Sequence, residues 1–122
     1  KIARNFLLGT IIESLGEAFA LTRKSGVDPA LFLSIITSTS MSAPAYKSYG
    51  RMIVEKAYEP TFALKLGLKD VELALEAAGD TRVPMPFAGL LREQHLAAIA
   101  RGYGDQDWAA LGEYIAESAG LY

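Results

Sequence analysis

The spacing of apolar residues along this chain is helical nearly everywhere. Apolar side chains recur every three or four positions, and no alternating run of strand length stands between turn residues. Gly26 ends the first helix, and Asp28 caps a second helix with Pro29 at its first position. The expected helices are Lys1 to Ser25, Pro29 to Thr37, Ala45 to Glu55 with an interruption near Gly50, Leu64 to Ala78 ended by Gly79 and Asp80, Phe87 to Arg101, and a last helix through Ser118 that Asp105 or Asp107 caps. The pattern predicts an all-α domain of five to seven helices with a long first helix.

Polar residues interrupt the apolar face of the first helix at its start. The core face consists of Leu8, Ile12, Leu15 and Phe19. The opposite, solvated side carries Glu13, Glu17 and Lys24. Lys1 and Asn5, one turn apart, continue the core face and not the solvated one. A cation and an amide on the apolar side suggest a site, with fraying of the first turn into solvent as the simpler alternative.

A carboxylate stands in a similar position on the fourth expected helix. One apolar stripe of this helix contains Leu64, Leu68, Val71, Leu75 and Ala78. Asp70 lies on a second apolar face, among Leu66, Leu73, Ala74 and Ala77. A carboxylate there is costly unless a cation or a hydrogen-bond donor meets it. Asp70 is therefore a candidate site residue, or an acceptor for hydrogen bonds from a neighbouring helix.

The first helix is apolar around much of its circumference. Phe6, Leu7, Ile11 and Ala18 extend the apolar surface, and Gly9 and Gly16 allow close approach of another helix. A helix that is apolar on most sides is buried on most sides, and the other short helices would struggle to cover it. We expect a homodimer, or a higher homo-oligomer, that buries more than roughly 1,000 Å².

Composition sets modest bounds on function. The 122 residues fit one domain with a substantial core. The net charge of −2, with scattered basic residues, argues against a nucleic-acid partner. The apolar run from Phe6 to Leu21 contains Glu13, Ser14 and Glu17, so no membrane span is expected. Cysteine is absent and histidine occurs once, which excludes thiolate and multi-histidine metal sites and favours a cytoplasmic protein.

Several other motifs have a simple structural interpretation. Gly102-Tyr103-Gly104 follows a helix and not a strand, so it is interpreted as a helix end and not as a phosphate loop. His95 is interpreted as a packing or surface residue and Trp108 as core packing. The hydroxyl-rich segment 38–42 is interpreted as a polar loop, although it could line a carboxylate or phosphate pocket. Two interpretations are open for Lys47, Arg51 and Lys56: they form a solvated face, or they contact a cofactor phosphate.

Taken together, these polar positions resemble a known family. The pattern comprises Lys1-x-x-x-Asn5 at the start of a long helix, Phe62 and the Lys69-Asp70 pair within Thr61-Phe-Ala-Leu-Lys-Leu-Gly-Leu-Lys-Asp-Val, and then Pro84 and Pro86. Across essentially the whole chain it resembles the C-terminal helical domain of the β-hydroxyacid dehydrogenases. These include 3-hydroxyisobutyrate dehydrogenase, tartronate semialdehyde reductase and glyoxylate/succinic semialdehyde reductase. The resemblance implies a fold like the C-terminal domain of 6-phosphogluconate dehydrogenase.

The resemblance also implies roles for individual residues. Lys1 would be the general acid/base that exchanges a proton with the substrate oxygen, while hydride moves to or from NAD or NADP. Asn5 would hold the substrate beside Lys1, Phe62 and Asp70 would shape and polarise the pocket, and Lys69 would reach the cofactor. The substrate would be a short β-hydroxyacid or its aldehyde or keto form.

Residues 1–122 then correspond to one substrate and dimerisation domain. The family's dinucleotide-binding domain and its Ser-Gly-Gly substrate segment precede the lysine and are absent from this sequence, so the chain alone is expected to be inactive. Lys1 opens the chain with no capping residue before it, and we expect the chain to start inside a longer helix. The alternatives are a helical oligomerisation module without catalysis, and an imine reductase of the same fold, against which Lys1 argues.

Overall fold

The computed structural model describes residues 1–122, and all of its regular elements are helical. Six α-helices and one short 3-10 helix follow one another along the chain, which confirms the all-α prediction. Their bounds are α1 (Ile2–Lys24), α2 (Pro29–Thr37), α3 (Pro44–Glu55), α4 (Leu64–Thr81), α5 (Pro86–Ala100), η1 (Trp108–Ala110) and α6 (Leu111–Ser118). No helix is long and apolar enough to cross a membrane.

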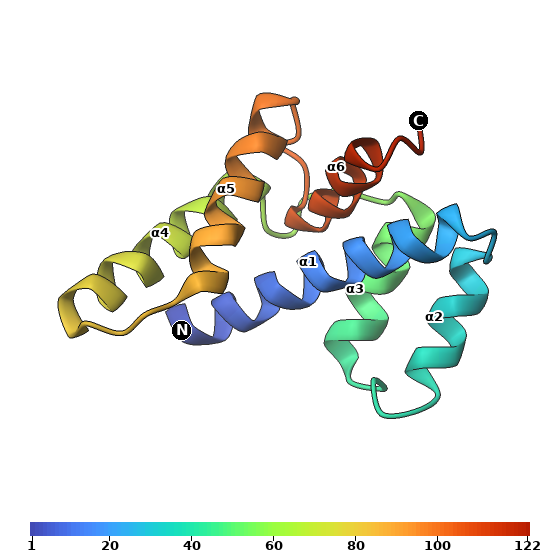
Figure 1. Ribbon diagram of the computed structural model, residues 1–122, viewed down its shortest axis with the longest axis horizontal. Coiled ribbons are helices and arrows are strands. Elements are labelled where there is room, and N and C mark those ends of the chain that lie inside the picture. The colour runs from blue at the N-terminus through green and yellow to red at the C-terminus, as the bar shows by residue number, and fades with distance from the viewer.

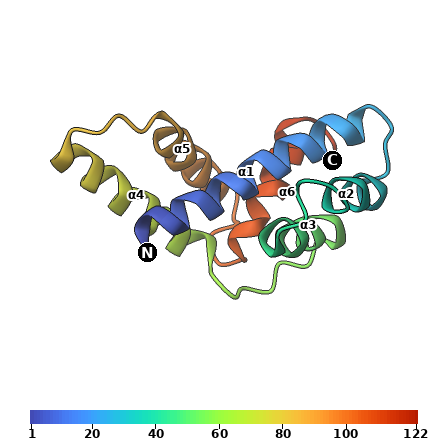
Figure 2. The same ribbon diagram turned by 90° about the horizontal axis from the view of Figure 1, so that it is seen from below.

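The long helix α1 lies at the centre of the molecule, and every other element packs against it (Figures 1 and 2). Helices α4 and α5 lie beside its N-terminal half, and α2 and α3 lie beside its C-terminal half. Helix α6 lies alongside α1, so the first and last helices of the chain pack side by side. This arrangement brings the start of α1 next to α4, the helix that carries Asp70.

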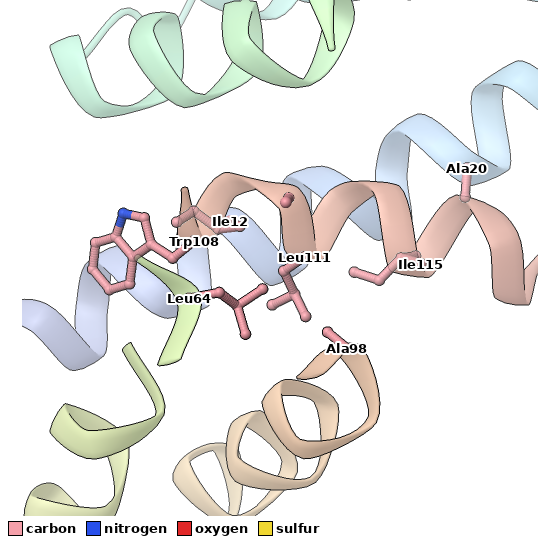
Figure 3. Close-up of a cluster of buried hydrophobic side chains, with 8 residues drawn as sticks. Ile12, Ala20, Leu64, Ala98, Trp108, Leu111 and Ile115 are labelled. Carbon is pink, nitrogen blue, oxygen red and sulfur yellow. The ribbon is translucent and has the colours of Figure 1, made fainter. Parts of the chain in front are cut away.

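The core forms where α1, α4, α5 and α6 meet (Figure 3). Its buried side chains are Ile12, Ala20, Leu64, Ala98, Trp108, Ala110, Leu111 and Ile115. A second cluster on the other side of α1 contains Leu15, Phe19 and Ile53. The prediction of core packing for Trp108 is confirmed, and of the two interpretations of His95 the structure supports packing and not a surface position, since both side chains are buried.

The glycines of α1 and α3 serve contacts within the chain. A Cβ at Gly16 would lie 2.7 Å from Cδ1 of Ile115 and 3.1 Å from the Cα of Gly112, so this glycine lets α6 approach α1. Gly50 is buried against Leu33 of α2, and α3 continues through it without a break. The predicted interruption near Gly50 is wrong, because this glycine provides space for a neighbouring helix and the helical hydrogen bonds continue past it.

Two helix ends differ from the sequence expectation. Helix α4 does not end at Gly79 and Asp80 but runs to Thr81, where Arg82 takes the left-handed conformation with φ 58°. The amide of Val83 then donates to the carbonyl of Ala78, and this closes the helix before Pro84. Asp107, the second of the two predicted caps, does not cap α6 itself but the short 3-10 helix η1 that precedes it, where its Oδ2 accepts from the amide of Ala109 at 2.9 Å.

The other local predictions are confirmed. Asp28 accepts from the amide of Leu31 at 3.0 Å and so caps α2. Gly102 follows the end of α5 with φ 95°, as a helix-ending glycine does. The loop after α2 uses its hydroxyls locally, since Ser38 Oγ donates to the carbonyl of Ile35 at 2.8 Å. The three basic residues of α3 and its end, Lys47, Arg51 and Lys56, are exposed.

Helix α2 leaves much apolar surface uncovered. It contains no buried residue, and the side chains of Leu31 and Ile35 are more than half exposed. Leu7 on α1 and Phe87 on α5 are also exposed. Exposed large apolar side chains therefore occur on α1, α2, α4 and α5.

Candidate active site

A hydrogen bond joins two of the residues that the sequence singled out. The side-chain amide Nδ2 of Asn5, on α1, donates to Oδ2 of Asp70, on α4, at 2.6 Å. The two residues are 65 positions apart in the sequence, and Asn5 is 8% exposed. The donor that a carboxylate on an apolar face requires is therefore Asn5.

The environment of Asn5 fixes the orientation of its amide. Arg4 Nη1 donates to the amide oxygen of Asn5 at 3.3 Å, and Asp70 accepts from the nitrogen. Because a carboxylate accepts and a guanidinium donates, the oxygen and nitrogen of the amide cannot exchange places without losing both contacts. Nδ2 keeps a second N–H, which can donate to a bound molecule.

Lys1 and Lys69 are both exposed at this end of the molecule. Lys1 is the N-cap residue of α1, and its carbonyl accepts from the amide of Asn5 at 2.9 Å. Neither lysine takes part in any of the ion pairs of the chain. Their ammonium groups are therefore available to ligands, although the structure does not join them to Asn5 and Asp70 through side-chain contacts.

Phe62 is held in place by the start of the last helical segment. The backbone amide of Phe62 donates to Oδ1 of Asp107 at 3.2 Å, and its carbonyl accepts from the amide of Trp108 at 2.9 Å. Its ring packs edge-on against Trp108, with 4.7 Å between ring centroids. The segment before α4 is thus fixed to η1 by hydrogen bonds and by aromatic packing.

Asp107 is the residue whose importance the sequence did not indicate. It is completely buried and accepts from the amides of Thr61, Phe62 and Ala109 and from the hydroxyl of Thr61. The sequence marked it only as one of two possible helix caps. The contacts to Thr61 and Phe62 cross more than forty positions of sequence, so no local pattern could show them.

Glu13 corrects a further prediction. The helical pattern assigned it to the solvated side of α1, but it is 6% exposed, because α5 packs against this side of the helix. Nε2 of Gln94 on α5 donates to its Oε2 at 3.4 Å. Burial, and after it the neighbouring carboxylate of Glu17, raise the pKa of Glu13 to about 8.

The donor set of the site suits an oxygen-rich anion or carbonyl compound and not a metal ion. The chain has no group of three or more histidine, aspartate or glutamate side chains that could hold a metal. Two free ammonium groups and an oriented amide N–H lie on α1 and α4. Such donors bind carboxylates, phosphates and developing alkoxides.

Comparison with known proteins gives a consistent result. Residues 1–115 match the family model described as NAD-binding of NADP-dependent 3-hydroxyisobutyrate dehydrogenase. The uncharacterized oxidoreductase YfjR of Bacillus subtilis is 41% identical over 112 residues, which cover 91% of this chain and 39% of that protein. Glyoxylate/succinic semialdehyde reductase 1 of Arabidopsis thaliana is 31% identical over 94% of this chain and 40% of its own length.

A solved structure agrees with these sequence matches. The crystal structure of 3-hydroxyisobutyrate dehydrogenase from Salmonella typhimurium superimposes with a TM-score of 0.87 at 25% identity, over 93% of this chain and 40% of that one. The chain thus spans about two fifths of the length of these two relatives. The matched part of the Salmonella enzyme corresponds to the helical fold of this chain. The chain belongs to the β-hydroxyacid dehydrogenase family, a family of NAD(P)-dependent oxidoreductases.

Proposed function

We propose that this chain supplies the proton-transferring and substrate-holding side of an NAD(P)-dependent oxidoreductase for short β-hydroxyacids or their aldehyde or keto forms. The observation that carries the proposal is the Asn5–Asp70 hydrogen bond, because it joins residues that the family pattern had marked as substrate contacts. Family membership and the free ammonium groups of Lys1 and Lys69 support it.

Lys1 is the proposed general acid/base. Hydride that reaches a carbonyl carbon leaves negative charge on oxygen, and an ammonium group stabilises this charge and then protonates the oxygen. In the reverse direction the neutral amine accepts the hydroxyl proton. Lys1 can do this because it is exposed and has no carboxylate partner within the chain.

Asn5, Asp70 and Phe62 are the proposed substrate-binding residues. Asp70 holds Nδ2 of Asn5, so the second N–H of this amide has a defined direction in which to donate to the substrate. Phe62, fixed by Asp107 and Trp108, supplies an apolar wall for the carbon skeleton. Orientation of this kind contributes to catalysis because the reacting atoms are held together before the reaction.

The residues of this chain fit a limited role toward the nicotinamide cofactor. When bound, the cofactor accepts or donates the hydride. Lys69 offers an unpaired, exposed cation suited to a phosphate group. The chain has no glycine-rich turn between a strand and a helix, so the amides that cradle the pyrophosphate belong, in this proposal, to another domain of the parent protein.

The decisive experiment replaces Lys1 in the full-length protein. We expect Lys1→Ala to lower kcat by a factor on the order of 10² or more, the usual contribution of a general acid, with little change in cofactor affinity. Lys1→Arg also fails, because a guanidinium does not release its proton near neutral pH. The assay follows NADH or NADPH absorbance with glyoxylate, succinic semialdehyde and 3-hydroxyisobutyrate as substrates.

Lys47→Ala is the matched control, since Lys47 is an exposed lysine on α3. It should leave kcat unchanged. Wild-type turnover in Lys1→Ala removes Lys1 from the mechanism. Absence of oxidoreductase activity with every short hydroxyacid and aldehyde tested leaves the oligomerisation module as the better function.

Self-association is part of the proposal. Gly9 and Gly16 allow close packing of α5 and α6 of the same chain against α1, so these two glycines do not require a second subunit. The uncovered apolar residues of α2, with Leu7 on α1, support an isologous dimer. Light scattering at micromolar concentration should give twice the monomer mass, and Ile35→Asp, on α2, should shift it toward the monomer.

A further inference from the structure

Glu13 is a buried carboxyl group to which the chain offers no counter-charge. It lies in the middle of α1, and its residue surface is almost fully covered. Oε2 accepts one long hydrogen bond from Gln94, and no N–H or hydroxyl group of the chain donates to Oε1. A buried carboxyl oxygen without a partner destabilises the fold. An unsatisfied group of this kind is explained when a ligand supplies the missing partner.

A second carboxylate, Glu17, follows one turn later on α1 and is exposed. No ion pair of the chain includes Glu13 or Glu17. Arg92 on α5 is engaged elsewhere, with Glu72 at 3.3 Å and Glu93 at 3.1 Å. The two carboxyl groups therefore face a region of α5 that provides an amide but no cation.

Between these helices lies a cavity of about 350 Å³. Its α1 wall carries four hydrogen-bonding side chains, Thr10, Glu13, Ser14 and Glu17. Its α5 wall is apolar and consists of Phe87, Leu90 and Leu91. Phe87 is 66% exposed, which is unusual for a phenylalanine that has no partner. A cavity of this size, apolar on one side and acidic on the other, suits a small amphipathic molecule.

We propose that this α1–α5 cavity binds an organic cation, an ammonium or guanidinium group on an apolar stem. The charged head meets Glu13 and Glu17 and donates to the unpartnered Oε1, while the stem lies against Phe87 and Leu90. Neither Lys1 nor Asn5 lines this cavity, and it is a site separate from the proposed active site. The cation site holds whether or not the chain serves a dehydrogenase.

The chemistry of the walls favours this ligand over the other classes. An anion would meet two carboxyl groups and no cation. A metal ion would lack ligands, because the chain has no cluster of three suitable side chains. An uncharged apolar molecule would leave Oε1 of Glu13 without a partner. A positive donor satisfies this oxygen and offsets negative charge on the pair.

An NMR titration of the intact protein tests the proposal through the amide signals of Leu90 and Leu91. The probe is 2-phenylethylammonium chloride, and its uncharged counterpart is 2-phenylethanol. We expect the ammonium to bind with a Kd of about 1 mM or tighter, as its few heavy atoms allow, and the alcohol at least ~10-fold more weakly. Because burial raises the pKa of Glu13 to about 8, the titration is run above pH 8, where its carboxyl group is ionised. There Glu13→Gln should weaken ammonium binding by at least ~10-fold, since it removes the charged acceptor.

Glu76→Gln is the matched control, because it makes the same charge change at an exposed position on α4. It should leave the Kd unchanged. If Glu13→Gln fails to fold, Glu17→Gln provides the same comparison at an exposed residue. Absence of saturable binding up to about 10 mM, equal binding of the alcohol, or full affinity in both glutamate variants would overturn the proposal.

A second ligand distinguishes the source of the cation. N-acetyl-L-arginine amide imitates an arginine side chain of a partner protein, and 2-phenylethylammonium imitates a free amine. Tighter binding of the arginine derivative assigns the cavity to a protein side chain, and the reverse order assigns it to a small metabolite. Failure of both ligands to bind overturns the cation site.

Discussion

Replacement of Asp107 tests the idea that one buried carboxylate fixes the segment that presents Phe62. Asp107 accepts from the amides of Thr61 and Phe62, from the Thr61 hydroxyl and from the amide of Ala109. In Asp107→Ala the exposed Thr61 recovers hydrogen bonds to water, but the completely buried Ala109 does not. An orphaned buried amide costs about 1–3 kcal/mol, and this cost already includes the helix cap, because the capping hydrogen bond is the one to the amide of Ala109. With the charged contact to Phe62, the expected loss is about 3–5 kcal/mol.

Asp107→Asn separates charge from shape. Asparagine keeps one acceptor oxygen but turns an NH₂ group toward amides that also donate, so we expect a loss of roughly 2 kcal/mol. Urea denaturation followed by fluorescence measures both losses, because Trp108 is the only tryptophan and packs directly on Phe62. Typical domains have only about 5–15 kcal/mol of stability, so either change is easily seen.

Asp105→Ala is the control for this measurement. Asp105 lies two residues before Asp107, is fully exposed, and pairs with Lys65 at 2.6 Å. Its removal should leave the denaturation midpoint unchanged, since exposed ion pairs contribute little. A loss below about 1 kcal/mol in Asp107→Ala, or an equal loss in Asp105→Ala, would refute the reasoning.

Three further predictions concern packing, pH and the isolated domain. Gly16→Ala should destabilise the protein by about 1–3 kcal/mol in thermal denaturation, despite the better helix propensity of alanine, because the new Cβ meets α6. Gly79 has open space around it, so Gly79→Ala should stabilise the protein by about 0.5–1 kcal/mol in the same measurement. Because the pKa of Glu13 is raised from 4.5 to about 8 in the folded state, the folded state binds a proton that the unfolded state does not, and the stability of the protein should fall as pH rises between these values. Urea denaturation midpoints at pH 5 and pH 8 should therefore differ less in Glu13→Gln than in the wild type. An unchanged difference contradicts the assignment of this pH dependence to Glu13. Calorimetry of residues 1–122 alone should show no low-micromolar complex with NADH or NADPH, and such a complex would contradict the assignment of the phosphate-binding amides to another domain.

Local chemistry made the helices predictable. Asp28 and Pro29 mark the start of α2 through a side-chain cap and a fixed φ angle, and these signals lie within a few residues of each other. The inward position of Asn5 and Asp70 was also visible from helical periodicity. Their hydrogen bond was not, because the crossing of α1 and α4 decides which polar residues meet.

The failures come from the same limit. Gly50 and Gly79 were taken as helix breaks, yet α3 and α4 continue through both of them. Packing of α2 against α3 explains the glycine at position 50 better than backbone freedom does. Glu13 looked solvated because the helical pattern of α1 carries no information about where α5 lies. At Gly50 and at Glu13 a contact between distant segments overrode a local preference.

The pairing of α1 with α6 has a consequence for how the protein is made. These helices stand at opposite ends of the chain, and Leu111 and Ile115 complete the core around Ile12 (Figure 3). During synthesis α1 leaves the ribosome before α6, and its apolar face stays open until α6 emerges, because contacts of such sequence separation close late. The domain must therefore fold after translation of its last residues, and loss of Leu111–Ser118 by premature termination would leave the central helix exposed to aggregation.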